Sequence, residues 1–113
     1  MLQLVTAIIK PAQLGPVKET LKKSGVAGIT VTEANGFGRQ GGHTETYRGA
    51  EYEVEFIPKV KIEVLCDDVD ADRIVDVIAS AGRTGEIGDG KIWVTEVSKA
   101  LRIRTGEVGA EAV

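Results

Sequence analysis

The segment at residues 85–91, GEIGDGK, has the composition of a phosphate-binding loop. It matches the first part of the Walker A pattern, in which backbone N–H groups surround a phosphate and a lysine adds a positive charge. The match then fails, because Ile92 replaces the Ser or Thr that should hold magnesium and a helix is predicted before the loop. A P-loop NTPase is therefore excluded. Two interpretations stay open: an anion-binding nest assisted by Lys91, or a tight turn that needs glycine for positive φ angles.

A second glycine pattern, GFGRQG at residues 36–41, follows a predicted strand and matches the dinucleotide-binding fingerprint G-x-G-x-x-G. That fingerprint also needs a helix directly after it, so that the helix N-terminus faces the pyrophosphate. The next residues, GHTE at 42–45, have no helical apolar face. A Rossmann site is therefore rejected.

Two arginines near the C-terminal end, Arg102 and Arg104, are separated by one residue. In an extended segment, both guanidinium groups then point to the same side. They form an ordinary solvated basic edge unless the fold brings them to the glycine loop at 85–91, where they would add charge for a polyanion.

The sequence contains no arrangement typical of catalysis. His43 is the only histidine, and no residues around it have metal-ligand spacing. Cys66 is the only cysteine, at the end of a predicted strand, where we expect a small buried hydrophobic side chain. There is no Ser-His-Asp set, no Cys-His pair and no isolated carboxylate dyad to nominate. We therefore expect a protein that is not an enzyme.

The composition is that of one globular domain spanning residues 1–113. The 113 residues, 42% of them hydrophobic and 27% charged, are enough for one core and too few for two. A single cysteine excludes an internal disulfide and favours a reducing cytoplasm. The net charge of −3 argues against direct nucleic-acid binding, and the apolar runs are too short for membrane insertion.

Hydrophobic periodicity divides the chain into two similar units. Alternating apolar side chains predict strands at residues 2–10, 28–34, 59–66 and 91–97. One-sided apolar faces predict helices at 11–24 and 69–81, the second capped by Asp67 and Asp68. This order predicts an α+β, ferredoxin-like sandwich of the split βαβ type (βαββαβ), with both helices on one face. The insert at 36–58 is long for a compact domain, and such loops are often binding loops.

Three segments together resemble the PII family of nitrogen-regulatory signal-transduction proteins. They are GFGRQGGHTETYRGAEYEVEFIPK at residues 36–59, TGEIGDGKIWV at 84–94 and RIRTGE at 102–107. The resemblance covers the chain up to about residue 107 and implies a homotrimer with nucleotide sites between subunits. It also implies that the insert is the T-loop, at about 37–57, which reaches partner proteins. The small, polar composition of about 105–113 separately indicates a flexible tail.

The resemblance also implies ligands and partners. The ligands are ATP or ADP, and 2-oxoglutarate bound together with Mg-ATP. The partners are regulated proteins such as an ammonium transporter, nitrogen-metabolism enzymes that regulate glutamine synthetase, or transcription regulators. The protein would be a cytoplasmic sensor whose output is the conformation of the T-loop. The alternative is a small nucleotide-hydrolysing enzyme that uses the same cleft between subunits.

The family's ligand contacts are carried over to the matching positions of this chain. The phosphates would bind at Gly88, Asp89, Gly90 and Lys91, with Arg102 and Arg104 from the neighbouring subunit. The other nucleotide contacts would be Gly38 and Arg39 at the base of the T-loop and, around adenine and ribose, Ile8, Thr30, Glu63 and Leu65. Gln40 would ligate Mg²⁺ beside the nucleotide and contact 2-oxoglutarate, whose site also includes Lys59 and Gly88. Tyr52 matches the tyrosine that some members carry as a uridylylation or adenylylation site.

Two positions depart from the family pattern. Gly41 stands where many relatives have lysine, so one positive charge at the root of the T-loop is absent. Ala50 stands where cyanobacterial relatives carry a phosphorylated serine, which excludes serine control at that position.

Overall fold

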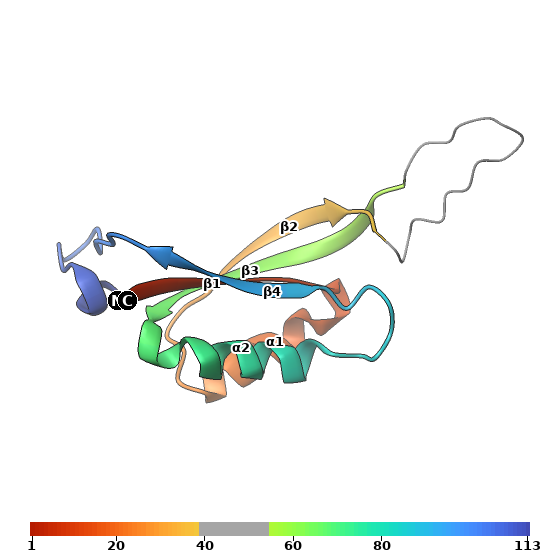
Figure 1. Cartoon of the computed structure of the whole chain (residues 1–113), viewed down its shortest axis with the longest axis horizontal. Coiled ribbons are helices and arrows are strands. Elements are labelled where there is room, and N and C mark those ends of the chain that lie inside the picture. Colours follow the sequence, from red (N-terminus) through yellow and green to blue (C-terminus); the bar gives the residue numbers. More distant parts are fainter. Residues whose placement is uncertain (39–54) are drawn as a thin grey trace, which may run out of the picture.

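The computed structural model describes residues 1–38 and 55–113 (Figure 1). Its elements are β1 (Leu2–Ile9), a 3-10 turn (Pro11–Gln13), α1 (Leu14–Lys23), β2 (Thr30–Gly36), β3 (Ile57–Asp67), α2 (Asp68–Gly82), β4 (Lys91–Val97) and a second 3-10 turn (Gly109–Ala112). The order β1-α1-β2-β3-α2-β4 confirms the predicted ferredoxin-like fold. Within these described ranges, no helix has the length and apolar character needed to cross a bilayer.

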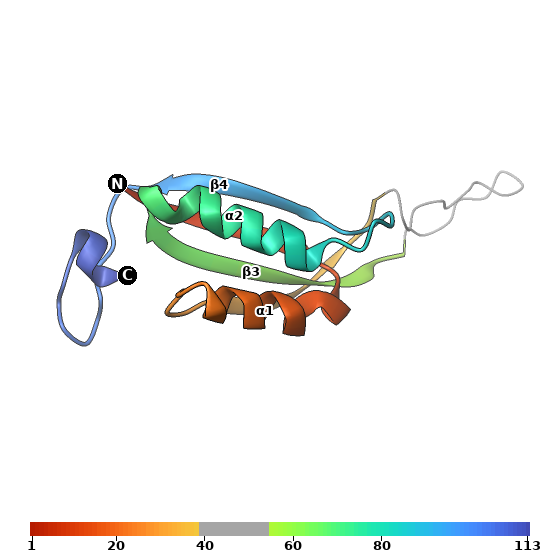
Figure 2. The ribbon, with the colours of Figure 1, turned by 90° about the horizontal axis from the view of Figure 1, so that it is seen from below.

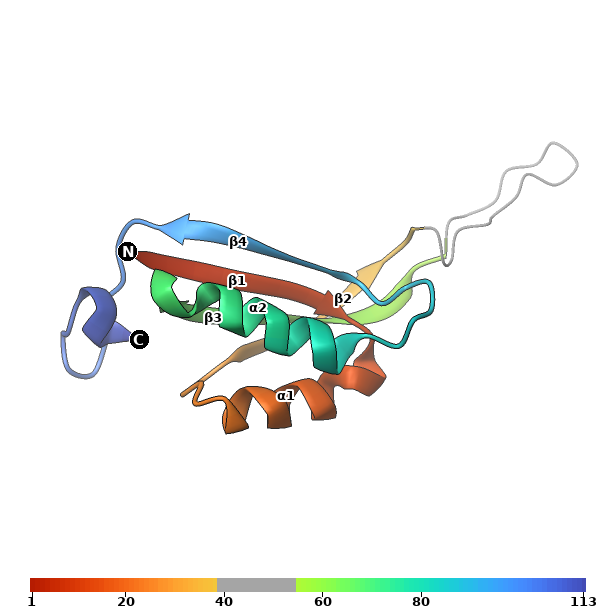
Figure 3. The same ribbon diagram turned by 60° about the horizontal axis from the view of Figure 1, so that its bottom comes forward.

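One antiparallel sheet positions the strand ends. Its strand order is β2-β3-β1-β4, which places β3 and β1 at the centre. The pairing of β1 with β3 runs from Leu2 opposite Asp67 to Ile9 opposite Val60, and β4 pairs with β1 so that Lys91 lies opposite Ile8. Both α1 and α2 lie on one face of the sheet, as predicted, and neither covers the other face (Figure 2, Figure 3).

The hydrophobic core lies between the sheet and the helices. Side chains alternate along β1, so Val5, Ala7 and Ile9 point toward the helices and are buried. The helix side chains that complete this core are Val17 and Leu21 from α1 and Ala71, Ile74 and Ile78 from α2. Cys66 belongs to the same cluster and is 3% exposed, which confirms the predicted small buried side chain. Because this packing holds the strands rigidly, residues at the strand ends keep fixed relative positions.

Several element bounds differ from the sequence prediction. β2 runs from Thr30 to Gly36 instead of 28–34, and α1 begins at Leu14, after the 3-10 turn, instead of at residue 11. β3 begins at Ile57 instead of residue 59, because its pairing with β2 continues until Gly36 lies opposite Ile57. Asp67 is the N-cap residue of α2, but its side chain makes no capping hydrogen bond. Instead, the Asp68 N–H donates to the Met1 carbonyl oxygen at 2.8 Å. The cap is thus completed by a residue distant in sequence, which a local capping rule cannot identify.

The segment after β4 has a defined conformation, although its composition indicates a flexible tail at about 105–113. Leu101 pairs with Val108 in an isolated bridge, and a 3-10 turn follows. Arg102 donates to the Glu107 carboxylate at 3.1 Å and to the Val113 carbonyl oxygen at 2.7 Å. The tail lies at the end of the sheet where β1 begins (Figure 3). Its mobility in solution stays a prediction.

Candidate functional site

A hollow of about 570 Å³ opens at the end of the sheet where β1 ends and β4 begins. Several predicted site residues line it, namely Ile8, Gly38, Lys59, Gly88, Gly90 and Lys91. The lining is completed by Gly36, Phe37, Ile87 and Trp93. The structure thus brings together the end of β1, the open ends of β2 and β3, and the loop between α2 and β4 (Figure 1).

The loop between α2 and β4 needs glycine at defined positions. Gly85, Gly88 and Gly90 have φ angles of 89°, 99° and 106°. A Cβ atom on Gly90 would lie 1.7 Å from the Ile8 carbonyl oxygen, so a side chain cannot fit there without moving the backbone. The tight-turn interpretation of these glycines is therefore confirmed. The same turn brings Gly88, Gly90 and Lys91 to the hollow. The anion-binding nest stays a prediction.

Asp89 holds this loop from within. Its carboxylate accepts hydrogen bonds from the Thr84 hydroxyl at 2.5 Å and from the backbone N–H groups of Thr84 and Gly85 at 2.8 and 2.9 Å. These bonds, the Thr84 hydroxyl first, and the nearby Lys10 charge lower the pKa of Asp89 to about 2. The carboxylate is therefore ionised at neutral pH and is engaged by the loop itself.

Lys59 is a nearly buried cation at the same hollow. Only 8% of the residue is exposed, and its Nζ donates a hydrogen bond to the Gly88 carbonyl oxygen at 2.5 Å. Burial lowers the pKa of this ammonium; repulsion from Lys10 lowers it further, and attraction to Asp89 opposes the shift. Among the described residues, the Gly88 carbonyl oxygen accepts one of the three ammonium protons. An ammonium at this place is suited to an anion that enters the hollow.

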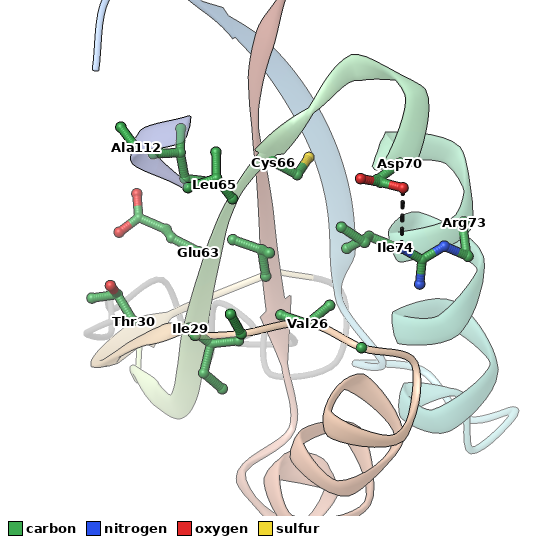
Figure 4. Close-up of a pocket in the computed structure, with 15 residues that line it drawn as sticks. Val26, Ile29, Thr30, Glu63, Leu65, Cys66, Asp70, Arg73, Ile74 and Ala112 are labelled. Atoms are coloured by element: carbon green, nitrogen blue, oxygen red, sulfur yellow. Dashed lines mark hydrogen bonds and ion pairs between the residues drawn. The ribbon is translucent and has the colours of Figure 1, made fainter. Parts of the chain in front are cut away.

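The other residues expected around a base and ribose lie elsewhere in the same chain. Thr30, Glu63 and Leu65 line a second hollow of about 380 Å³, which the tail residues Ala112 and Val113 also line. Figure 4 shows Thr30 on β2 and Glu63 and Leu65 on β3, with Ala112 beside them. These three residues do not line the first hollow.

Arg102 and Arg104 are also remote from the glycine loop within one chain. They follow β4, whereas Lys91 is the first residue of that strand. At about 3.3 Å per residue, the length of β4 alone separates the two ends by roughly 20 Å. Arg102 is bonded to the tail, and Arg104 is exposed. The predicted contacts are thus divided between opposite ends of β4.

Sequence reasoning missed Lys10 and Thr84. Their side chains meet at 3.2 Å although they are 74 positions apart, so no local pattern could indicate the contact. Trp93 also lines the first hollow and is 45% exposed. The predicted residues Arg39, Gln40 and Tyr52, and also Gly41, His43 and Ala50, lie outside the residues that the structure describes.

The fold and the first hollow define a ferredoxin-like domain with a glycine-rich loop beside two lysines, Lys59 and Lys91, and comparisons with known proteins identify its family. The family model described as "Nitrogen regulatory protein P-II" matches residues 2–107. A nitrogen regulatory protein P-II of Azospirillum brasilense is 60% identical over 109 residues, which cover 96% of this chain and 97% of that protein. The nitrogen regulatory protein GlnK of Escherichia coli (strain K12) is 54% identical over 112 residues, covering 99% of this chain and 100% of GlnK.

A solved structure agrees with these relatives. The crystal structure of Arabidopsis thaliana PII bound to citrate has a TM-score of 0.83 and 37% sequence identity, over 99% of this chain and 92% of that chain. The chain belongs to the PII family of nitrogen regulatory proteins. Proteins of this family are regulatory signal transducers, and the alternative of a nucleotide-hydrolysing enzyme finds no support among these relatives.

Proposed function

We propose that this protein binds ATP or ADP in a cleft between the subunits of a homotrimer. The observation that carries the proposal is the division of the expected contacts between the two ends of β4. Lys91 lines the hollow at the start of β4, whereas Arg104 follows its other end. Since one chain does not bring both to the same phosphates, a neighbouring copy would supply the arginines. In a closed ring, each subunit contributes its loop to the cleft with one neighbour and its arginines to the cleft with the other, so every cleft has both sets of residues.

The uncovered face of the sheet supports this association. Leu4 and Ile8 alternate with the core residues of β1, so they point to the face without helices. Trp93 lies on the same face, because it pairs with Thr6 of β1, and it is 45% exposed. A second copy packed there would remove apolar surface from water, which stabilises by about 25 cal/mol per Å².

The hollow also suits a carboxylate effector beside the phosphates, and we assign it 2-oxoglutarate, bound together with Mg-ATP. Lys59 offers an ammonium that is already close to Gly88, and Gln40 would hold Mg²⁺ together with the phosphate oxygens. In the part of the chain that the structure describes, no three His, Cys, Asp or Glu side chains gather to hold a metal, so the nucleotide would supply most ligands. The citrate-bound PII of Arabidopsis thaliana supports a small polycarboxylate ligand.

The insert at about 37–57 would transmit the ligand state to partner proteins. We assign it the control of an ammonium transporter, of glutamine synthetase regulation or of transcription regulators in the cytoplasm. Tyr52 is the proposed site of uridylylation or adenylylation. The names of the P-II and GlnK relatives support a role in nitrogen regulation.

Subunit mixing tests the divided site. Lys91→Ala removes the charge of the loop, Arg104→Ala removes the charge expected from the neighbour, and each variant alone should bind ATP weakly in calorimetric titration. Refolding an equal mixture produces trimers in which about a quarter of the clefts combine an intact loop with intact arginines. That fraction should bind ATP with wild-type affinity. Lys18→Ala, on the exposed side of α1, is the control that should not change binding.

The outcome is decisive in both directions. Recovery in the mixture shows that the site is shared between subunits. A mixture as weak as its components, or full ATP binding by a protein that sediments as a monomer at micromolar concentration, would contradict the proposal.

A further inference from the structure

Lys10 connects the end of β1 to the loop between α2 and β4, which lie next to each other (Figure 3). Its Nζ lies 3.2 Å from the Thr84 hydroxyl oxygen, 3.4 Å from Glu86 Oε1 and 3.5 Å from Asp89 Oδ1. An ammonium group has three N–H donors, and here three oxygens of one loop surround it. Only 24% of the Lys10 side chain is exposed, so it is held against the loop and does not extend into water.

The Thr84 hydroxyl at the centre of this network has its hydrogen-bonding capacity fully used. It donates to Asp89 Oδ1, and it accepts from the Lys10 ammonium and from the Glu86 N–H, both at 3.2 Å. A hydroxyl has one donor and two acceptor positions, so each has a partner. Removal of Lys10 would therefore disturb the turn that leads into the glycines of the hollow.

The charges of the loop give Lys10 a second effect. Glu86 and Asp89 are carboxylates of the same loop that brings Lys91 to the hollow. A polyphosphate that approaches this loop would meet two negative charges and one positive charge. Lys10 adds a positive charge within 3.5 Å of both carboxylates, so it offsets their repulsion of a phosphate.

We propose that Lys10 is a positioning residue of the nucleotide site, which fixes the loop and compensates its two carboxylates so that a polyphosphate can bind at Lys91. The inference rests on the proposed nucleotide binding. Lys10 does not line the hollow itself, so it acts through Thr84, Glu86 and Asp89. Its part in lowering the pKa values of Asp89 and Lys59 shows that its charge acts on groups around the same loop.

Calorimetric titration of the full chain with ATP, in the absence of 2-oxoglutarate, tests this role. Lys10→Met keeps the apolar stem and removes the charge, and it should weaken ATP binding by about three- to tenfold. The loss should be smaller for AMP, which carries fewer phosphate charges, and Lys10→Arg should retain most of the affinity. Lys18→Met, the same change at an exposed position of α1, is the matched control.

A double variant separates charge compensation from a merely structural role. The Glu86 side chain is 77% exposed, so Glu86→Gln should fold normally. If Lys10 compensates loop charge, adding Glu86→Gln to Lys10→Met should recover part of the lost affinity, because one repulsive carboxylate is gone. If Lys10 only holds the fold together, removal of another contact should bring no recovery. Glu86→Gln alone should tighten ATP binding by about twofold, because one carboxylate that repels the phosphates is removed while the positive charge of Lys10 remains.

Each outcome decides the matter. If the wild type binds ATP and Lys10→Met binds it with the same affinity, this inference is overturned and the proposed function stays intact. A wild-type protein that binds neither ATP nor ADP would overturn both. If Lys10→Met does not fold, the single Glu86→Gln variant decides, and unchanged ATP affinity in it overturns the inference.

Discussion

Replacement of Gly90 by alanine tests how closely the α2–β4 loop approaches β1. The new Cβ atom would lie 1.7 Å from the Ile8 carbonyl oxygen and 2.7 Å from the Ile8 carbonyl carbon. Real Cβ atoms are essentially never closer than 3.0 Å to a heavy atom, and backbone atoms cannot rotate away as the end of a side chain can. The loop or β1 must therefore shift by at least the difference between 3.0 and 1.7 Å.

The backbone conformation adds a second cost. Gly90 has a φ angle of 106°, and a residue with a side chain in such a region is strained by about 1–3 kcal/mol. The forced shift also disturbs the pairing of Ile8 with Lys91 at the start of β4. We expect Gly90→Ala to lower the free energy of unfolding by more than about 3 kcal/mol, a large part of the usual total of about 5–15 kcal/mol.

Gly85→Ala is the matched control in the same loop. Its φ angle is 89°, but an added Cβ atom would have no heavy atom within 4 Å, so only the conformational strain of about 1–3 kcal/mol applies. Urea unfolding followed by the fluorescence of Trp93, the only tryptophan, gives both values. Protein concentration must be equal in all samples, because association of subunits adds to stability. Equal destabilisation by the two variants would refute the steric reasoning.

Three further predictions concern other groups of the described chain. Because the pKa of Asp89 is lowered to about 2, its bonds stabilise the fold above the pH at which a free Asp ionises and lose this effect as the pH falls toward 2. The free energy of unfolding, measured with urea between pH 5 and 2, should therefore fall less steeply for Asp89→Asn than for the wild type. Calorimetry should show 2-oxoglutarate binding with Mg-ATP but not with Mg-ADP or without nucleotide. Lys59→Ala should abolish this binding while ATP binding persists. If Lys59→Ala instead removes ATP binding and leaves 2-oxoglutarate binding, Lys59 belongs to the nucleotide site and not to the 2-oxoglutarate site. Burial first, and then the nearby carboxylates, raise the pKa of Cys66, so the thiol should react with a thiol reagent at pH 8 only after unfolding; rapid reaction of the folded protein would contradict its burial.

The sequence by itself determined the elements and the family. The alternation of Val60, Ile62 and Val64 and the one-sided apolar faces of the helices are local periodic patterns, which backbone geometry converts directly into strands and helices. The strand 91–97 was predicted with the bounds that the structure shows. The glycines of 85–91 and the motifs around them identified the family, because such turns demand specific residues at fixed spacing.

Only the tertiary structure decided which residues meet. Lys10 and Thr84 are 74 positions apart, Lys59 and Gly88 are 29 apart, and each pair meets because sheet pairing brings the end of β1, the start of β3 and the α2–β4 loop together. Whether a glycine is required at position 90 likewise depends on the Ile8 carbonyl of another strand. Contacts of this kind depend on the path of the whole chain through a close-packed core and not on any local period, so the residues that hold the loop became visible only in the folded arrangement.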